Sequence, residues 1–179
     1  MTINESRAAP LASPPVAGRR VAAVIATWFG AGLMPRAPGT WGTLAAVPFA
    51  WAFGRLGQAA FLIALLVVTV VGSWAADVYC RATGRHDNQR IVVDEVAGYF
   101  LTLALSPRTP VYLLLGFIFF RLFDITKPPP VRWIDRNVRG GFGVVADDLG
   151  AGVYAALVLL LLERTGATAF LGRLLGGGA

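Results

Sequence analysis

The feature that most restricts the fold is an uncharged run of 19 residues, Gln58–Ala76, with the sequence QAAFLIALLVVTVVGSWAA. A bilayer-crossing helix needs about 20 predominantly apolar residues, so this run predicts a membrane-spanning helix. The composition agrees, because 56% of the 179 residues are hydrophobic and 15% are charged, whereas soluble domains are usually about 25% charged. Leu149–Leu162 predicts a second span. Two shorter runs, Val96–Leu105 and Val111–Phe120, predict helices that are half-inserted or buried among the others.

Segments rich in proline and glycine separate these apolar runs and favour turns between helices. The sequence therefore predicts an all-α fold, a single membrane-associated helical bundle of about five to seven helices, several of them short or half-inserted. The expected helices are 20–31, 41–53, 58–81, 92–105, 110–126, 130–138 and 144–163. Residues 1–20 are expected to form a disordered basic tail, 21–165 the helical domain and 166–179 a C-terminal tail.

The charged residues are distributed unevenly between the two ends of these helices. If successive helices run antiparallel, one face of the bundle collects nine basic residues and the other collects three, Arg55, Arg108 and Arg164. Basic residues accumulate on the cytoplasmic side of membrane proteins, so the first face is expected to meet the cytoplasm. The net charge of +6 is expected to favour anionic headgroups, and no nucleic-acid-binding pattern is visible.

The same face holds five acidic residues at helix ends. They are Asp94, Glu95, Asp124, Asp147 and Asp148. Acids near a helix N-terminus also favour the helix dipole, which is the simpler explanation for one such pair. Two pairs and a third aspartate on one face favour a site, because carboxylates gathered there repel one another unless a cation lies between them. Mg²⁺ prefers such oxygen ligands, while a single histidine, His86, and a single cysteine, Cys80, argue against zinc.

Basic residues beside these acids predict a phosphate-binding function. Arg121 is three residues before Asp124 and shares its helix face, which also fits a simple intrahelical ion pair. Lys127 is the only lysine of the chain, and the proline after it is expected to hold its backbone extended. Its ammonium is suited to a phosphate oxygen, although a lysine that reaches for lipid headgroups is the alternative.

The segment PRAPGTWGT offers a weaker signal at the start of the second helix. Thr40 is expected to be the N-cap, with Thr43 three residues later, and a helix N-terminus preceded by glycine can hold a phosphate. An ordinary cap explains the segment equally well. RGGFG at 139–143 is expected to be a flexible loop or a backbone cradle. The small residues Gly152 and Ala156, four apart, predict close helix packing.

Four motifs in order, PGTWGT, HDNQRIVVDEVAG, FRLFDITKPPPVRWIDRN and GGFGVVADDLGAG, resemble the phosphatidylglycerophosphatase A family over residues 29–160. The resemblance implies an all-helical bundle around a central helix and Mg²⁺-dependent removal of phosphate from phosphatidylglycerophosphate in bacterial inner membranes. It implies that the five acids form the metal and catalytic cluster and that Arg121 and Lys127 address the phosphate. Lys127 is also counted with the catalytic residues, and Thr40, Thr43 and Arg136 with the phosphate-binding ones.

The sequence thus predicts a membrane lipid phosphatase with its site at the cytoplasmic surface, a phospholipid as substrate and no protein partner. A carboxylate either activates water or attacks phosphorus itself, and the sequence leaves both routes open. Other phosphatase and nucleotide-binding signatures are absent, including D-x-D-x-T, a Walker loop and G-x-S-x-G. The alternatives are a phosphatase of another small or lipid phosphomonoester and a non-enzymatic membrane transporter or scaffold.

Overall fold

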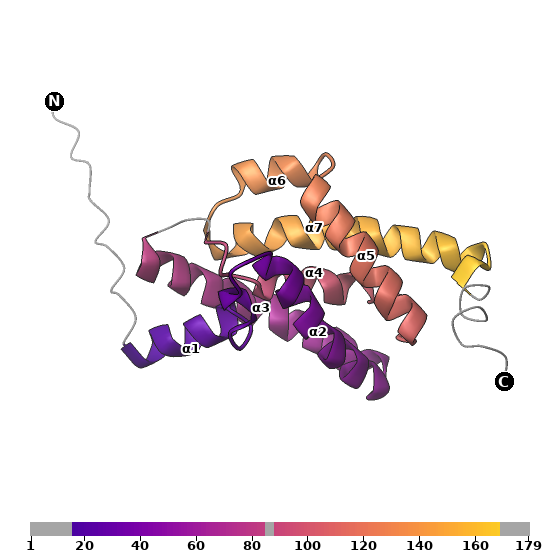
Figure 1. The fold of residues 1–179 in the computed structure, drawn as a ribbon, viewed down its shortest axis with the longest axis horizontal. Helices are drawn as coiled ribbons and strands as arrows, with labels where there is room; N and C mark the ends of the chain where they lie inside the picture. The colour runs from indigo at the N-terminus through magenta and orange to yellow at the C-terminus, as the bar shows by residue number, and fades with distance from the viewer. Residues whose placement is uncertain (1–15, 85–87, 169–179) are drawn as a thin grey trace, which may run out of the picture.

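The computed structural model describes residues 16–84 and 88–168, so most of both predicted tails and His86 lie outside the described residues. Within these ranges it is entirely helical and has no strand, which confirms the all-α prediction (Figure 1). The elements are α1 (Val16–Ala26), the 3₁₀ helix η1 (Ala31–Leu33), α2 (Pro38–Arg55), α3 (Gln58–Thr83), α4 (Val93–Thr102), α5 (Pro110–Thr126), α6 (Val131–Asn137) and α7 (Gly140–Arg164).

Several predicted boundaries need correction. α1 begins at Val16, four residues before the expected start. α2 begins at Pro38, because proline suits the first helical position, and its N-cap is Ala37; Thr40 is therefore inside the helix and not its cap. RGGFG is not a loop: α7 begins at Gly140. A Cβ on the next residue, Gly141, would lie 2.0 Å from the carbonyl oxygen of Ser73, so glycine lets this first turn pack directly on α3.

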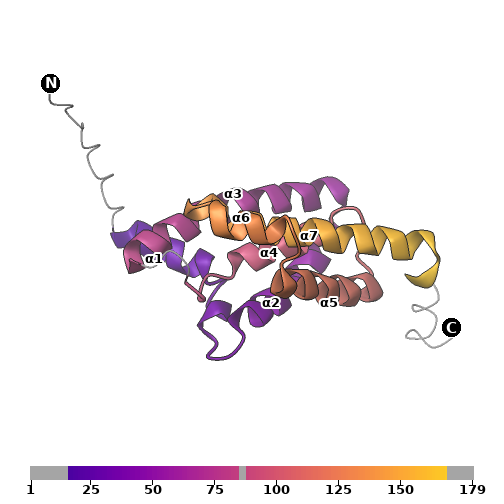
Figure 2. The same ribbon diagram turned by 90° about the horizontal axis from the view of Figure 1, so that it is seen from above.

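The central helix of the bundle is α4. Figure 2 shows it between α3 on one side and α2 and α5 on the other, and seven of its ten residues are buried. The Tyr99 hydroxyl donates to the carbonyl oxygen of Leu113, 2.9 Å away, and so ties α4 to α5. Phe100 stacks on Phe61 of α3 with ring centroids 5.1 Å apart. The acids at the start of α4 therefore lie on a helix that is fixed from several sides.

Two glycines allow α4 and α7 to approach closely. A Cβ on Gly152 would lie 2.5 Å from the carbonyl oxygen of Gly98, and a Cβ on Gly98 would lie 2.6 Å from that of Asp148. Small residues at such crossings let helix backbones come together in membrane proteins. This contact confirms the packing role predicted for Gly152, and it brings the start of α4 beside the acidic pair of α7.

Two helices, α3 and α7, are long and apolar enough to cross a membrane. Both present large apolar side chains on the molecular surface, among them Leu66 and Leu161, each 62% exposed. Exposed apolar surface of this extent marks a contact with lipid or protein. The shorter run at 96–105 falls largely in α4, which is buried among the other helices, the second of the two predicted arrangements.

Candidate active site

Five helices contribute to one cavity of about 450 Å³, which lies where α2, α4 and α7 begin, α5 ends and α6 passes nearby. The five predicted acids, Arg121 and Lys127 all line it. Residues from four separate motifs thus meet in space, as the sequence predicted. Asp94 on α4 and Asp148 on α7 lie close together. Had they been on opposite sides of the molecule, the predicted site would have been wrong.

Three of the acids form the tightest group. One carboxylate oxygen each from Asp94, Glu95 and Asp148 lies within 4.8 Å of the other two. Among the described side chains, no basic group forms an ion pair with Asp94 or Asp148. Glu95 Oε2 is buried and has no hydrogen-bond partner. A divalent cation with oxygen ligands would compensate this charge and fill the coordination that the protein leaves open.

Burial raises the pKa of Glu95 well above its usual value, and the charges of Asp94 and Asp124 raise it further against the opposing effect of Arg121. The pKa of Asp94 is also raised, mainly by burial, although the backbone N–H of Glu95 donates to Asp94 Oδ1 at 3.0 Å and favours the charged form. Without a cation, these two side chains therefore hold protons more tightly than ordinary carboxyl groups do. Strongly shifted carboxyl groups in a cavity are typical of functional sites.

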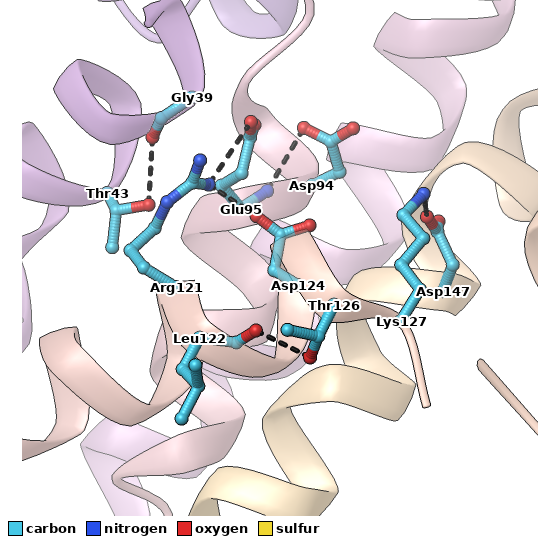
Figure 3. A network of polar contacts seen from close by, with 10 residues as sticks. All are labelled: Gly39, Thr43, Asp94, Glu95, Arg121, Leu122, Asp124, Thr126, Lys127 and Asp147. Atoms are coloured by element: carbon cyan, nitrogen blue, oxygen red, sulfur yellow. Dashed lines mark hydrogen bonds and ion pairs between the residues drawn. The ribbon is translucent and has the colours of Figure 1, made fainter. Parts of the chain in front are cut away.

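Arg121 lies beside this group and is held by carboxylates on two helices (Figure 3). Its guanidinium is paired with Asp124 on α5, and Nη1 lies 3.8 Å from Glu95 Oε1. Gly39 makes room for this arrangement, because a Cβ there would lie 2.0 Å from Glu95 Oε1. The start of α2, the start of α4 and the end of α5 are thus packed around one guanidinium.

Lys127 supplies a second cation about one turn beyond Asp124. Its Nζ donates to Asp135 Oδ1 at 2.5 Å and to Asp147 Oδ2 at 2.6 Å, and Figure 3 shows it beside Asp147. The predicted extended backbone is wrong: Lys127 has φ 43° and ψ 65°, the left-handed conformation that closes α5. Burial alone would lower the Lys127 pKa, but the two carboxylates outweigh it and raise the pKa, so the side chain stays an ammonium.

The acids therefore fall into two sets. Among the described side chains, Asp94 and Asp148 have no ion pair and Glu95 has only the 3.8 Å contact with Arg121, whereas Asp124 is closely paired with Arg121 and Asp147 with Lys127. This division separates a group that can bind a cation from two ion pairs that hold positive charge at the cavity.

Comparison with known proteins agrees with this arrangement. A model of the family described as PgpA, phosphatidylglycerophosphatase A, matches residues 24–163. The chain belongs to the phosphatidylglycerophosphatase A family. It is therefore a phosphatase, and the predicted enzyme class is confirmed.

Three relatives illustrate the range of this family. Phosphatidylglycerophosphatase A of Escherichia coli is 37% identical over 140 residues, covering 78% of this chain and 81% of that protein. The protein of the same name from Haemophilus influenzae is 37% identical over 142 residues, covering 78% and 87%. A Bacteroides thetaiotaomicron protein, provisionally named a phosphatidylinositol-3-phosphatase, is 40% identical over 149 residues, covering 76% and 89%. No solved structure gives a significant match.

Three predicted phosphate-binding residues of this family member do not line the cavity: Thr40, Thr43 and Arg136. Thr43 is fully buried and its hydroxyl donates to the carbonyl oxygen of Gly39 at 2.9 Å, which is a structural bond within α2. Arg136 is exposed on α6. The structure instead adds Asp135, which holds Lys127, and the pair Asn88 and Gln89, which line the cavity from the loop before α4.

The position of Asn88 and Gln89 in a polar loop directly before the DE pair is the sequence signal that could have identified them. Asp135 carried a weaker signal, because only its place in the third motif marked it. Its partner is eight residues away across a proline-rich turn, a distance at which helical spacing predicts no contact.

Proposed function

We propose that this protein is a Mg²⁺-dependent phosphatase that hydrolyses the terminal phosphate of phosphatidylglycerophosphate at the cytoplasmic surface of the bacterial inner membrane. The observation that carries the proposal is the cavity itself, in which a three-carboxylate group lies beside two held cations at the ends of apolar helices. The names of the Escherichia coli and Haemophilus influenzae relatives support the substrate.

The donor set fits Mg²⁺. Its members are three carboxylates, from Asp94, Glu95 and Asp148, and one oxygen of Glu95 is buried without a partner. Oxygen-only ligation by a few carboxylates is the coordination that Mg²⁺ takes in phosphate-handling enzymes. When bound, the ion neutralises charge on the phosphate oxygens.

The protein's own cations bind and orient the substrate phosphate. Arg121 presents a planar guanidinium, which suits two phosphate oxygens at once. Lys127 acts as a fixed positive charge, because its raised pKa keeps its proton at neutral pH. Both cations are held by carboxylates before substrate binds, so little reorganisation is needed as negative charge develops on the phosphate.

Hydrolysis breaks the bond between phosphorus and the glycerol oxygen, and the oxygen of water ends on phosphate. Either a carboxylate of the cluster removes a proton from the attacking water, or a carboxylate attacks phosphorus and water then cleaves the acyl phosphate. Acid quenching during turnover of substrate with a radiolabelled terminal phosphate separates the two routes. The covalent route leaves a labelled aspartyl or glutamyl phosphate on the protein, whereas direct attack by water leaves the protein unlabelled.

The proposed orientation rests on charge and on the ends of the helices. The sequence pattern assigns nine basic residues to the helix ends on the side of the acidic cavity and three to the opposite ends, which favours a cytoplasmic position for the site. Of the two candidate spans, α3 ends on the side of the cavity and α7 begins on it. A substrate could then keep its acyl chains in the bilayer while its phosphate enters the cavity.

The direct test measures phosphate release from phosphatidylglycerophosphate by detergent-solubilised protein, with Mg²⁺ and with chelator. We expect release that needs Mg²⁺ and that Asp148→Asn abolishes while its elution volume and thermal unfolding stay close to wild type. Asp77→Asn, which alters an exposed ion pair with Arg81 outside the cavity, is the matched control. Equal rates with metal and with chelator would contradict the metal proposal, and an active Asp148→Asn variant would contradict the site.

A second candidate substrate is another lipid phosphomonoester, which the provisional name of the Bacteroides thetaiotaomicron relative favours. Rates with phosphatidylglycerophosphate, phosphatidylinositol-3-phosphate and phosphatidate under the same conditions decide between them. The non-enzymatic alternative is set aside, because the chain belongs to a family of enzymes and its acidic cavity lies at one end of the bundle.

A further inference from the structure

A second cavity, of about 360 Å³, lies between α2 and α5. Its lining is entirely apolar: Leu44, Val47, Pro110, Leu113, Leu114 and Phe117. This volume lies within the range of about 300–1,000 Å³ that small-molecule sites occupy. Leu44 and Leu114 are about half exposed, at 48% and 50%, so the groove is open along one side. Figure 2 shows its two helices next to each other.

The face of α5 that lines the groove also carries residues of the acidic cavity farther along the helix. The lining residues from Pro110 to Phe117 are spaced three and four apart, which places them on one helix face. The same spacing leads from Phe117 to Arg121 and from Arg121 to Asp124, both of which line the acidic cavity. Phe117 and Arg121 are one helical turn apart, about 6 Å along the axis.

The α2 side of the groove has the same arrangement. Val47 is four residues from Thr43, and Thr43 is four residues from Gly39, which lines the acidic cavity. Gly39 and Val47 are separated by about 12 Å along the helix. On each helix, residues that line the apolar groove and residues that line the acidic cavity thus follow one another at helical spacing, with the fully buried Thr43 between them on α2.

We propose that the groove between α2 and α5 holds one acyl chain of the lipid whose phosphate occupies the acidic cavity. This inference rests on the proposed function and specifies its substrate as a lipid that the protein recognises through both its phosphate and one acyl chain. The acyl chain is already in an apolar bilayer, so its transfer into the groove contributes little hydrophobic free energy. Its effect is positional: it fixes the lipid along the two helices so that the phosphate meets Arg121.

The kinetic test compares two substrates with the same reacting phosphate, dipalmitoyl phosphatidylglycerophosphate and its deacylated headgroup, glycerophosphoglycerophosphate. Leu44→Trp and Leu114→Trp fill the groove from its two sides at half-exposed positions. Leu62→Trp, on α3 and 42% exposed, is the matched control. We expect each groove variant to lower kcat/KM for the diacyl lipid by about tenfold through misplacement, with the deacylated ester turned over at the wild-type rate.

Two kinetic results would overturn the inference. One is equal rates of the groove variants and Leu62→Trp on the diacyl lipid. The other is an equal loss on both substrates, because that would mean a general defect of the site and no role for the chain. If wild-type protein releases phosphate from neither substrate, the proposed function fails, and the groove is judged by binding alone.

The binding test uses phosphatidylglycerophosphate with a photoreactive diazirine at the end of one acyl chain, in detergent with chelator to prevent turnover. We expect cross-links to peptides of α2 and α5, removed by excess unlabelled phosphatidylglycerophosphate but not by phosphatidylcholine, which has no phosphomonoester. Cross-links spread over α3 and α7, or cross-links that phosphatidylcholine removes equally, would overturn the inference and indicate ordinary lipid contact.

Discussion

The two ends of α2 each bring a glycine against an arginine. At the start of the helix, a Cβ on Gly39 would lie 2.0 Å from Glu95 Oε1 and 3.0 Å from Arg121 Nη1. At the other end, a Cβ on Gly54 would lie 2.9 Å from Cγ of Arg108. Local packing is therefore similar at both ends, with a helix backbone directly on a guanidinium-bearing side chain.

The partners of the two arginines differ in charge. Arg121 is paired with carboxylates of Glu95 and Asp124 beside an open cavity. Arg108 instead donates from Nη2 to Gln58 Oε1 at 2.6 Å and to a backbone carbonyl oxygen at 3.2 Å.

Arg108 also lies over the ring of Phe61, 4.2 Å from its centroid. The Nε atoms of both Arg108 and Arg121 are buried without a hydrogen-bond partner, so this feature does not distinguish the two arginines. What marks Arg121 as the candidate functional arginine is the set of ionised partners around a cavity. Uncharged hydrogen-bond partners and an aromatic ring under the guanidinium, as at Arg108, indicate an arginine that packs helices together.

The largest expected effect of this difference is on catalysis. Arg121→Met should lower kcat/KM by about 100- to 1,000-fold, because one preorganised donor to the developing charge is lost. Arg108→Met should leave kcat/KM of the folded enzyme near wild type but destabilise it by about 0.5–1.5 kcal/mol, because its hydrogen bonds to Gln58 and to the backbone are lost. Phosphate release and thermal unfolding followed by tryptophan fluorescence measure both. Similar activity losses in the two variants would remove the distinction between the two ends.

Alanine substitutions of the two glycines compare the two ends of α2 within a single helix. Gly39→Ala should push the Glu95 carboxylate and Arg121 aside and lower kcat/KM by about 10- to 100-fold. Gly54→Ala requires Arg108 to shift, because the new Cβ would lie 2.9 Å from its Cγ. Alanine favours a helix by about 1 kcal/mol over glycine and offsets this cost, so stability should change little, and activity should not change because the site is at the other end of α2. Assays of the pair at equal folded concentration test this. Wild-type activity in Gly39→Ala would show that the close approach is not needed.

A smaller effect is expected for the acid that holds Lys127. Asp135→Asn weakens one of two contacts to Nζ while Asp147 keeps the other, so kcat/KM should fall by about tenfold, the order typical of residues that position a functional group. Asp135→Glu should restore most of the loss because it keeps the charge. Asp77→Asn is the comparison, since Asp77 also pairs with a basic residue, Arg81, but away from the cavity. An equal change in both variants would assign Asp135 a structural role only.

Much of this arrangement could be predicted from the sequence because its signals are local. The uncharged run beginning at Gln58 predicted α3, and the prolines at 110 and 128 set the limits of α5. The acids of two motifs lie at the start of α4 and about two turns into α7, so the alternation of helix direction alone brought them to one face.

The failures have a common physical cause, because they depend on contacts between helices. Thr43 looked like a phosphate ligand, but the packing of α2 on α4 turns it into the core. The glycines at 140 and 141 looked like a loop, yet they serve the contact of α7 with Ser73 on α3. Lys127 adopts a left-handed backbone because its side chain is held by both α6 and α7, which the proline rule could not anticipate.

The smallest expected effect is on stability and compares Glu95 with Glu163, an exposed acid at the opposite end of α7. The folded-state pKa of Glu95 is raised above its usual 4.5, so the folded protein binds its proton more tightly than the unfolded chain does. Without metal, this contribution is complete below about pH 4.5 and is lost as pH rises through the folded-state pKa, at up to about 1.4 kcal/mol per pH unit. Thermal unfolding in chelator should therefore show wild type losing stability with rising pH, and Glu95→Gln should reduce that loss more than Glu163→Gln does. Mg²⁺ should reverse the slope for wild type, because a bound cation favours the charged carboxylates; identical pH profiles for all three proteins would mean that the Glu95 carboxyl group is not perturbed by its surroundings.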